Sequence, residues 1–199
     1  ILDPQVLFNR TFVTAAVANF LSCFALLGIT AYSPIFVQEV MGIRPAISGS
    51  MMTPYTVVAA FIGIPAGFLL ARTGRYKWMY LVGYTIVTLC LLAMWQFSAA
   101  TPIWVFALVT AAAGVGLGTT VTLNTLVAQL AIPRRLLGVA VGAMFFFQML
   151  GLSVGPAILG IAQNSAPDLE RGLQLVFLVG AVAMAVALLI ILTIPEVSV

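Results

Sequence analysis

The sequence contains no histidine and very few charged residues of any kind. Its 199 residues include eight Lys or Arg and five Asp or Glu, so that 7% of the chain is charged. Ordinary soluble domains are about 25% charged. Hydrophobic residues make up 63% of the chain, which predicts an integral membrane protein. Cationic loops at a membrane explain the net charge of +3, so a nucleic-acid partner is not expected.

The long hydrophobic runs lack ionisable side chains at the depth of the hydrocarbon core. Proton relays and ion sites in membranes normally use such side chains, so we expect any coupling carboxylate to lie outside this chain. A Ser or Thr without a His or carboxylate partner is a poor nucleophile, which argues against an enzyme. Cys23 and Cys90 lie within the runs rather than in loops, and we expect neither a disulfide nor a metal site. No cofactor is predicted.

Six hydrophobic runs are each long enough to cross a bilayer as a helix, which takes about 20 residues. They cover residues of about 12–36, 46–71, 78–97, 102–130, 136–163 and 173–194. The loops between them are short and leave no room for a soluble domain. We therefore predict an all-α membrane protein in which residues 1–199 form a single six-helix transmembrane bundle.

The distribution of cations predicts how the bundle is oriented. One side of the six-span arrangement carries most of them: Arg10, Arg72, Arg75, Lys77, Arg134 and Arg135. Only Arg44 and Arg171 lie on the other side. Because loops rich in Lys and Arg stay in the cytoplasm, we predict that both termini are cytoplasmic. The chain begins with Ile rather than Met, and we expect it to be a piece of a longer protein.

Polar side chains recur on one face of several predicted helices. In the fourth, a stripe about 80° wide contains Thr110, Ala113, Leu117, Thr120 and Asn124. In the first, a stripe about 100° wide contains Asn19, Ser22, Cys23, Leu26, Thr30 and Ser33. We expect these two faces to be shielded from lipid.

Seven polar, aromatic or sulfur-containing residues are candidates to line a substrate cavity: Asn19, Cys23, Tyr55, Thr120, Asn124, Phe145 and Gln148. One interpretation is that their polar groups form hydrogen bonds between helices. The other is that they line a pocket, which would suit a bulky, amphipathic substrate, including a cationic one. The sequence leaves both open.

Three predicted helices carry four pairs of glycines four residues apart: Gly63 and Gly67, Gly114 and Gly118, Gly138 and Gly142, and Gly151 and Gly155. In lipid, small residues of this kind allow helices to pack closely, and that is the role we expect. Pro65 and Pro156 lie beside two of the pairs, and each removes an intrahelical hydrogen bond, which would help a helix bend. Both are followed by Ala, a faint sign of an inverted three-plus-three repeat.

The turn between the second and third helices reads Gly67-x-x-x-Ala71-Arg72-x-Gly74-Arg75-x-Lys77. It resembles the signature loop of the major facilitator superfamily, with Ala71 in place of an acidic residue. The resemblance implies a gating loop formed by Gly67, Arg72, Gly74, Arg75 and Lys77. In that superfamily the acid helps to lock the loop in one gating state.

The fifth helix carries an antiporter-like motif: Gly142, Gly151, Gly155, Pro156 and Gly160. It resembles the antiporter motif of the same superfamily, with Leu159 in place of one glycine. The stretches 2–12 and 133–140 are similar to the corresponding parts of the fourteen-helix drug:proton antiporters. The chain is thereby identified as resembling the C-terminal half of such a protein.

The resemblance implies a six-helix half of a major-facilitator fold, built as a three-plus-three inverted repeat. It further implies proton-coupled efflux of small amphipathic drugs by alternating access, in a bacterial inner membrane. The expected partners are the lipid bilayer, a missing N-terminal half of six to eight helices, the substrate, and protons bound outside this chain. The helices with Asn19 and Asn124 would line the cavity, and the one with Gln148 would stand beside it. The alternative is a non-transporting six-helix module, either truncated or self-assembling.

Overall fold

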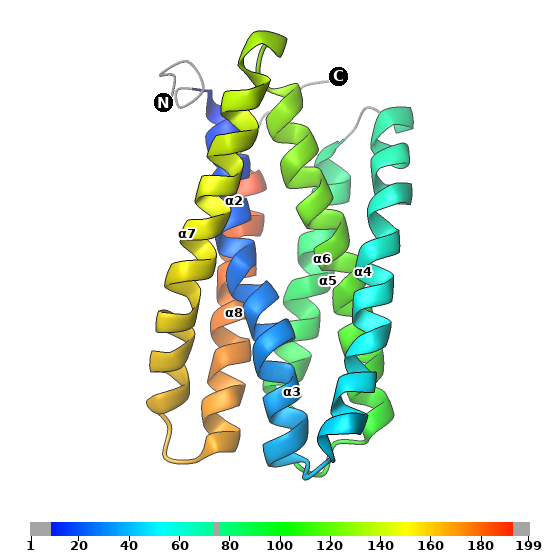
Figure 1. Ribbon diagram of the computed structural model, residues 1–199, viewed down its shortest axis with the longest axis vertical. Helices are drawn as coiled ribbons and strands as arrows, with labels where there is room; N and C mark the ends of the chain where they lie inside the picture. The colour runs from blue at the N-terminus through cyan, green and yellow to red at the C-terminus, as the bar shows by residue number, and fades with distance from the viewer. Residues whose placement is uncertain (1–8, 74–75, 193–199) are drawn as a thin grey trace.

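The computed structural model describes residues 9–73 and 76–192, and the described part contains helices and no strand. Six helical segments are long and apolar enough to cross a membrane. The prediction of an all-α, six-helix membrane protein is therefore confirmed. Figure 1 shows the helices running along the long axis of the molecule, with the start of α2 and the end of α8 at the same end.

The first crossing is one continuous helical run that changes its winding three times. It comprises α2 (Arg10–Leu27), the π-helix η1 (Gly28–Tyr32), the short α3 (Ser33–Ile35) and the π-helix η2 (Phe36–Val40). Pro34 explains the first change, since its ring would clash with the carbonyl four residues earlier in a regular α-helix. The wider π turn before it relieves that clash. The helix extends four residues past the predicted end at residue 36.

This π-helical winding also corrects the polar stripe predicted for the first helix. Asn19, Ser22, Cys23 and Ser33 are buried, but Thr30 is exposed. A 100° step per residue applies only to an α-helix, so the face predicted from it is displaced within η1, where Thr30 lies. The stripe on the fourth helix contains no such interruption, and all five of its residues are buried.

The other five crossings are α-helices: α4 (Pro45–Thr73), α5 (Tyr76–Trp95), α6 (Ile103–Leu130), α7 (Leu137–Asn164) and α8 (Leu169–Leu192). A single 3₁₀ turn, η3 (Arg134–Leu136), precedes α7. Pro65 and Pro156 lie inside continuous helices, as does Pro54. Helix α8 starts four residues before the predicted residue 173, and Glu170 in its first turn complements the positive end of the helix dipole.

Specific contacts fix the start of α2 and the turn after the first crossing. Asn9 accepts a hydrogen bond from the Phe12 amide at 3.1 Å and donates one to the Ala131 carbonyl at 2.8 Å, just past the end of α6. Gly42 has a φ of 67°, which a residue with a Cβ rarely adopts, and it reverses the chain between η2 and α4.

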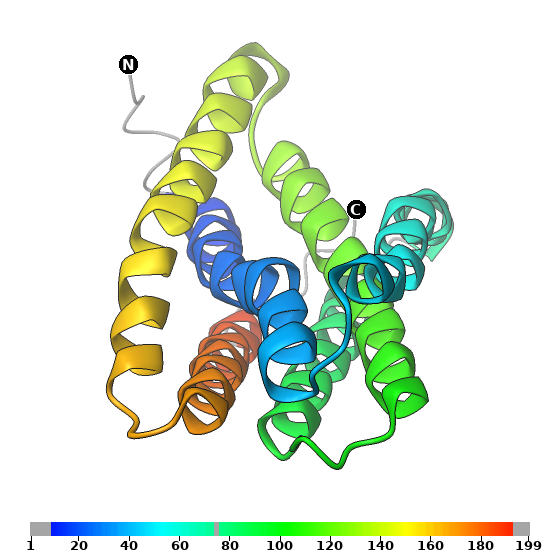
Figure 2. The same ribbon diagram turned by 60° about the horizontal axis from the view of Figure 1, so that its bottom comes forward.

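The packing of the helices follows the inverted repeat. Helix α2 packs against α7 and α8, and its counterpart α6 packs in the same way against α4 and α5. Helices α2 and α6 contact each other, as do α5 and α8. In Figure 2 α4 and α7 lie on opposite flanks of the bundle. One pair breaks the pattern: α7 and α8 pack together, whereas α4 and α5 hardly touch.

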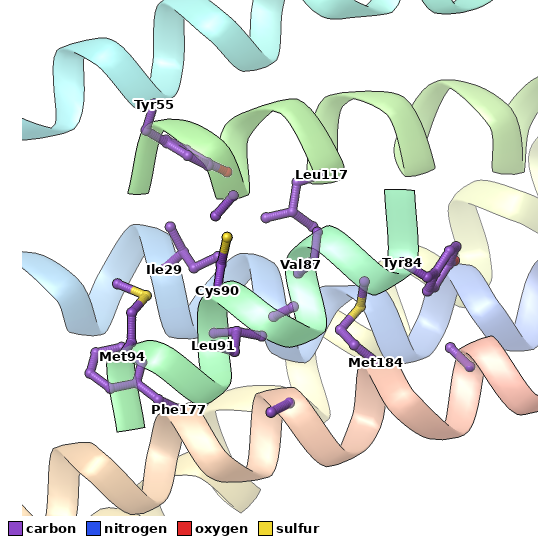
Figure 3. Close-up of a cluster of buried hydrophobic side chains, with 14 of the residues drawn as sticks. Ile29, Tyr55, Tyr84, Val87, Cys90, Leu91, Met94, Leu117, Phe177 and Met184 are labelled. Carbon is purple, nitrogen blue, oxygen red and sulfur yellow. The ribbon is translucent and has the colours of Figure 1, made fainter. Parts of the chain in front are cut away.

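The core lies where α5 and α8 meet the first crossing and α6. Figure 3 shows side chains from these elements, among them Ile29, Val87, Leu117 and Phe177, converging on one region. The flanking helices keep large apolar side chains on their outer faces. On α4, Phe61 and Ile64 are 69% and 73% exposed, as expected for a surface covered by lipid or by further helices.

Candidate functional site

A small cluster of polar side chains lies inside the otherwise apolar bundle. It consists of Asn19 and Ser22 on α2, Tyr84 on α5 and Asn124 on α6, and we refer to it as the amide cluster. Their side chains are at most 6% exposed, and those of Tyr84 and Asn124 are completely buried. Since water and lipid cannot reach them, their polar atoms must satisfy one another.

Hydrogen bonds connect the four members in a chain. The Asn124 amide nitrogen donates to Asn19 Oδ1 at 3.5 Å, and the Tyr84 hydroxyl donates to Asn124 Oδ1 at 3.2 Å. The hydroxyls of Tyr84 and Ser22 lie 3.0 Å apart. Asn19 Nδ2 also donates to the Met144 carbonyl of α7 at 3.4 Å. The amide cluster therefore connects α2, α5, α6 and α7.

The two hydroxyl groups of the amide cluster, on Ser22 and Tyr84, have two protons for three hydrogen-bond contacts. Ser22 Oγ lies 2.8 Å from the Ala18 carbonyl, so three contacts share the two hydroxyl protons of Ser22 and Tyr84. If Ser22 donates to Ala18, Tyr84 must divide its proton between Ser22 and Asn124. If Ser22 donates to Tyr84, the Ala18 contact loses its proton. The rotation of the two hydroxyl groups therefore decides which of the three contacts is left without a proton.

The two bonds made by the amide nitrogens are the weak part of the cluster. At 3.4 and 3.5 Å they exceed the usual N–H···O distance of about 2.9–3.0 Å. Interhelical hydrogen bonds in membranes contribute about 0.6 kcal/mol on average and about 2 kcal/mol at most. These amides stabilise the bundle, yet each bond is weak enough to be replaced by a bond to another polar group.

Of the other predicted cavity residues, two are placed beside the amide cluster by hydrogen bonds. Cys23 Sγ lies 3.4 Å from the Asn19 carbonyl and 3.6 Å from the Gln148 carbonyl, which places Cys23 and the Gln148 backbone beside it. Thr120 is buried and bonds within α6 to the Leu117 carbonyl. Tyr55 is buried where α4 crosses Gly114, and Phe145 is 58% exposed on α7. A cavity role for these seven residues stays a prediction.

Tyr84 was missed by sequence reasoning, although a signal for it existed. Tyrosine in the middle of a hydrophobic run brings a hydroxyl that needs a partner when buried. The sequence does not indicate the partner of the Tyr84 hydroxyl, because Ser22 and Asn124 lie on other helices, 62 and 40 residues away. Only the packing of α6 against both α2 and α5 brings the three together.

The glycine pairs differ in what surrounds them. Cβ atoms built on Gly114 and Gly118 would collide with the backbone of α4, and one built on Gly151 would collide with the backbone of α2. Gly155 faces the side chain of Leu27. A Cβ built on Gly138, Gly142 or Gly160 would meet no neighbouring helix or side chain within 4 Å, so only part of the antiporter-like motif serves packing within this bundle.

The predicted gating loop is partly outside the described residues, which exclude Gly74 and Arg75. Arg72 is exposed at the end of α4, and Lys77 is half-buried at the start of α5. A Cβ on Gly67 would meet Leu126 of α6 at an ordinary 3.8 Å. Within residues 9–73 and 76–192, no three His, Cys, Asp or Glu side chains come together as metal ligands would.

Comparison with known proteins gives one family. The sequence matches the model of the Major Facilitator Superfamily over residues 1–156. It is 30% identical over 160 residues to an uncharacterized MFS-type transporter of Mycobacterium tuberculosis, covering 80% of this chain and 23% of that protein. It is 32% identical over 157 residues to a tetracycline resistance determinant of Streptomyces rimosus, covering 78% of this chain and 45% of that protein.

A third relative is the multidrug transporter protein MdtP of Bacillus subtilis, 27% identical over 163 residues, which are 81% of this chain and 30% of MdtP. The chain spans less than half the length of each of these three relatives.

Proposed function

Because the chain belongs to the major facilitator superfamily, we propose that it acts in membrane transport, as the C-terminal six-helix half of an efflux transporter. The substrates would be small amphipathic molecules, drugs among them. Transport would occur by alternating access, in which two six-helix bundles rock about a central path. Catalysis is not part of this proposal.

One observation carries the proposal. The whole six-helix bundle aligns with a minor part of longer relatives, and two of these are named for tetracycline resistance and multidrug transport. The protein is integral to the membrane, since it belongs to this family and has six helices apolar enough to span. A bundle of six such helices is one half of the superfamily's fold.

The missing partner would be an N-terminal half of six to eight helices. The exposed apolar faces of α4 and α7 support this, since Phe61 and Ile64 on α4 and Phe145 and Phe146 on α7 are each more than half exposed. In a complete transporter, part of this surface would be covered by the other half and the rest by lipid. The coupling carboxylate would lie in that other half, because the predicted spans contain no ionisable side chain at depth.

The transport proposal is tested by expressing the complete open reading frame in a drug-sensitive bacterium and measuring efflux in inverted membrane vesicles. We expect drug movement that depends on an imposed pH gradient and is abolished by a protonophore. Residues 1–199 expressed alone should show none, since a proton carrier at membrane depth is absent from their sequence. Coupled efflux by residues 1–199 alone would instead support a self-assembling module. Absence of efflux from the complete protein against every substrate tested would contradict the proposal.

We further propose that both termini face the cytoplasm of a bacterium and that the protein resides in the inner membrane. Described residues Arg10, Arg72, Lys77 and Arg135 lie at one end of the bundle, the upper end in Figure 1, which favours this orientation. A cysteine introduced at Arg135 should react with a membrane-impermeant maleimide only after the cells are opened. One introduced at Ser165 should react in intact cells. The reverse pattern at both positions would overturn the orientation.

We also propose that the two amides of the amide cluster, Asn19 and Asn124, bind substrate. Asn19 and Asn124 lie on the two helices that, by resemblance, face the central path, and their mutual bond is long. When α2 and α6 move apart in another state of the transporter, both amides would be released to bond a substrate. Cys23 and Gln148 adjoin the same place.

A further inference from the structure

The flank of the bundle where α4 and α5 fail to pack holds a narrow crevice. Its volume is about 190 Å³, and its walls come from α4, α5 and the middle of α6. Pro65 and Leu69 contribute from α4, Trp78 and Val82 from α5, and Thr119 from α6. Drug-sized ligands occupy pockets of about 300–1,000 Å³, so this crevice is too small for them. Its size and apolar walls suit a single hydrocarbon chain.

The crevice exists because the inverted repeat is imperfect here. The counterpart pair, α7 and α8, packs together, whereas α4 packs against α6 and hardly touches α5. An open apolar gap facing the membrane must be filled, because an empty one forfeits dispersion contacts along its walls. Where this flank is not covered by the other half of the transporter, it faces lipid.

The crevice lies near the end of the bundle that carries cations, since Leu69 is close to the end of α4 and Trp78 is close to the start of α5. Arg72 follows Leu69 by three residues on α4 and therefore continues the same helix face, and Lys77 directly precedes Trp78. The carboxylates among the described residues, Glu39, Asp168 and Glu170, lie at the opposite end. A phosphate group at this end of the crevice would be attracted by the positive charges of Arg72 and Lys77.

Trp78 supplies a second indication of how deep the mouth lies. Its ring lines the crevice and is 44% exposed. Partly exposed Trp side chains settle at the level of lipid headgroups, with the ring against the acyl region and the N–H toward water. This places Arg72 and Lys77 at the depth of lipid phosphates.

From this geometry, we propose that the crevice between α4 and α5 is a binding site for an anionic phospholipid. One acyl chain occupies the apolar gap along Pro65, Leu69 and Val82, and the headgroup phosphate pairs with Arg72 and Lys77. Cationic pockets between membrane helices bind anionic headgroups in this way. The site is separate from the amide cluster and does not depend on whether the protein transports drugs.

The test uses the protein from the complete open reading frame, purified from bilayer discs that contain equal amounts of phosphatidylglycerol and phosphatidylcholine with identical acyl chains. Native mass spectrometry then measures how many molecules of each lipid stay bound. We expect retained phosphatidylglycerol to exceed phosphatidylcholine several-fold. The excess should disappear in the double variant Arg72→Gln/Lys77→Gln and in Val82→Phe, which narrows the crevice without changing charge.

The matched control is Arg44→Gln/Arg171→Gln, which removes two exposed cations from the other end and should leave the excess unchanged. If Val82→Phe keeps the full excess, the lipid is attracted by surface charge alone and the crevice assignment is wrong. Equal retention of both lipids by the unmodified protein would also overturn the proposal. Displacement of the lipid by free glycerol phosphate would overturn it too, because binding would then depend on the headgroup alone and not on an acyl chain in the crevice. Thr119→Leu fills the same space from α6 and replaces Val82→Phe if that variant does not fold.

Discussion

Replacing Gly118 with leucine is expected to remove most of the folded protein from the membrane. A Cβ at this position would lie 2.6 Å from the Ala59 carbonyl oxygen of α4 and would also overlap Ile62. Backbone atoms cannot rotate away, so α4 and α6 would have to separate. Overpacking of this kind costs about 1–3 kcal/mol even where side chains can adjust. The measurement is the monodisperse fraction of a fluorescent fusion after extraction in mild detergent.

The matched control is Gly160→Leu, which introduces the same side chain at a site where a Cβ would meet no neighbouring helix or side chain within 4 Å. It should leave the folded fraction unchanged. Gly155→Leu is expected to give a smaller loss than Gly118→Leu, because its nearest contact, Leu27 Cδ1 at 2.6 Å, belongs to a flexible side chain. Equal folded fractions for Gly118→Leu and Gly160→Leu would show that α4 and α6 do not cross as closely as described.

Asn124→Leu in the complete protein is expected to change the relative transport of two drugs about tenfold, an effect equivalent to about 1.4 kcal/mol. The reason is that a substrate bonded to this amide loses a partner that an apolar side chain cannot replace, while other substrates are unaffected. Asn19→Leu should also change the relative transport of the two drugs. The measurement is the transport rate of each drug divided by the amount of folded protein.

Tyr84→Phe separates this effect from simple loss of stability. It removes the hydroxyl that bonds Asn124 at 3.2 Å and Ser22 at 3.0 Å but leaves both amides in place. We expect it to lower the stability of the bundle by about 1 kcal/mol and to keep the drug profile. If Asn124→Leu and Tyr84→Phe both destabilise the bundle and neither changes the profile, the cluster only holds helices together.

Much of this protein follows from the period and composition of its sequence. Apolar runs of sufficient length dictate membrane helices, since a backbone in lipid must satisfy its hydrogen bonds within the helix. The polar stripe on α6 was predicted correctly because that helix is regular from Ile103 to Leu130. The signature loop and the antiporter-like motif also led to the correct family, because their order along the chain is specific even though each is short.

Other features were decided by tertiary structure alone, because they depend on how far apart helices lie. The sequence marks Gly118 and Gly142 alike, as members of glycine pairs, yet only Gly118 lies against another backbone. The sequence also does not show whether Asn19 and Asn124 bond each other or line a pocket separately. Their hydrogen bond exists only because α2 and α6 cross at these residues. The π turns before and after Ser33 shifted the exposed face of the first crossing in a way that no fixed helical period describes. The crevice between α4 and α5 likewise departs from the inverted repeat. It results from the packing of α4 against α6 rather than α5, which no residue pattern indicates.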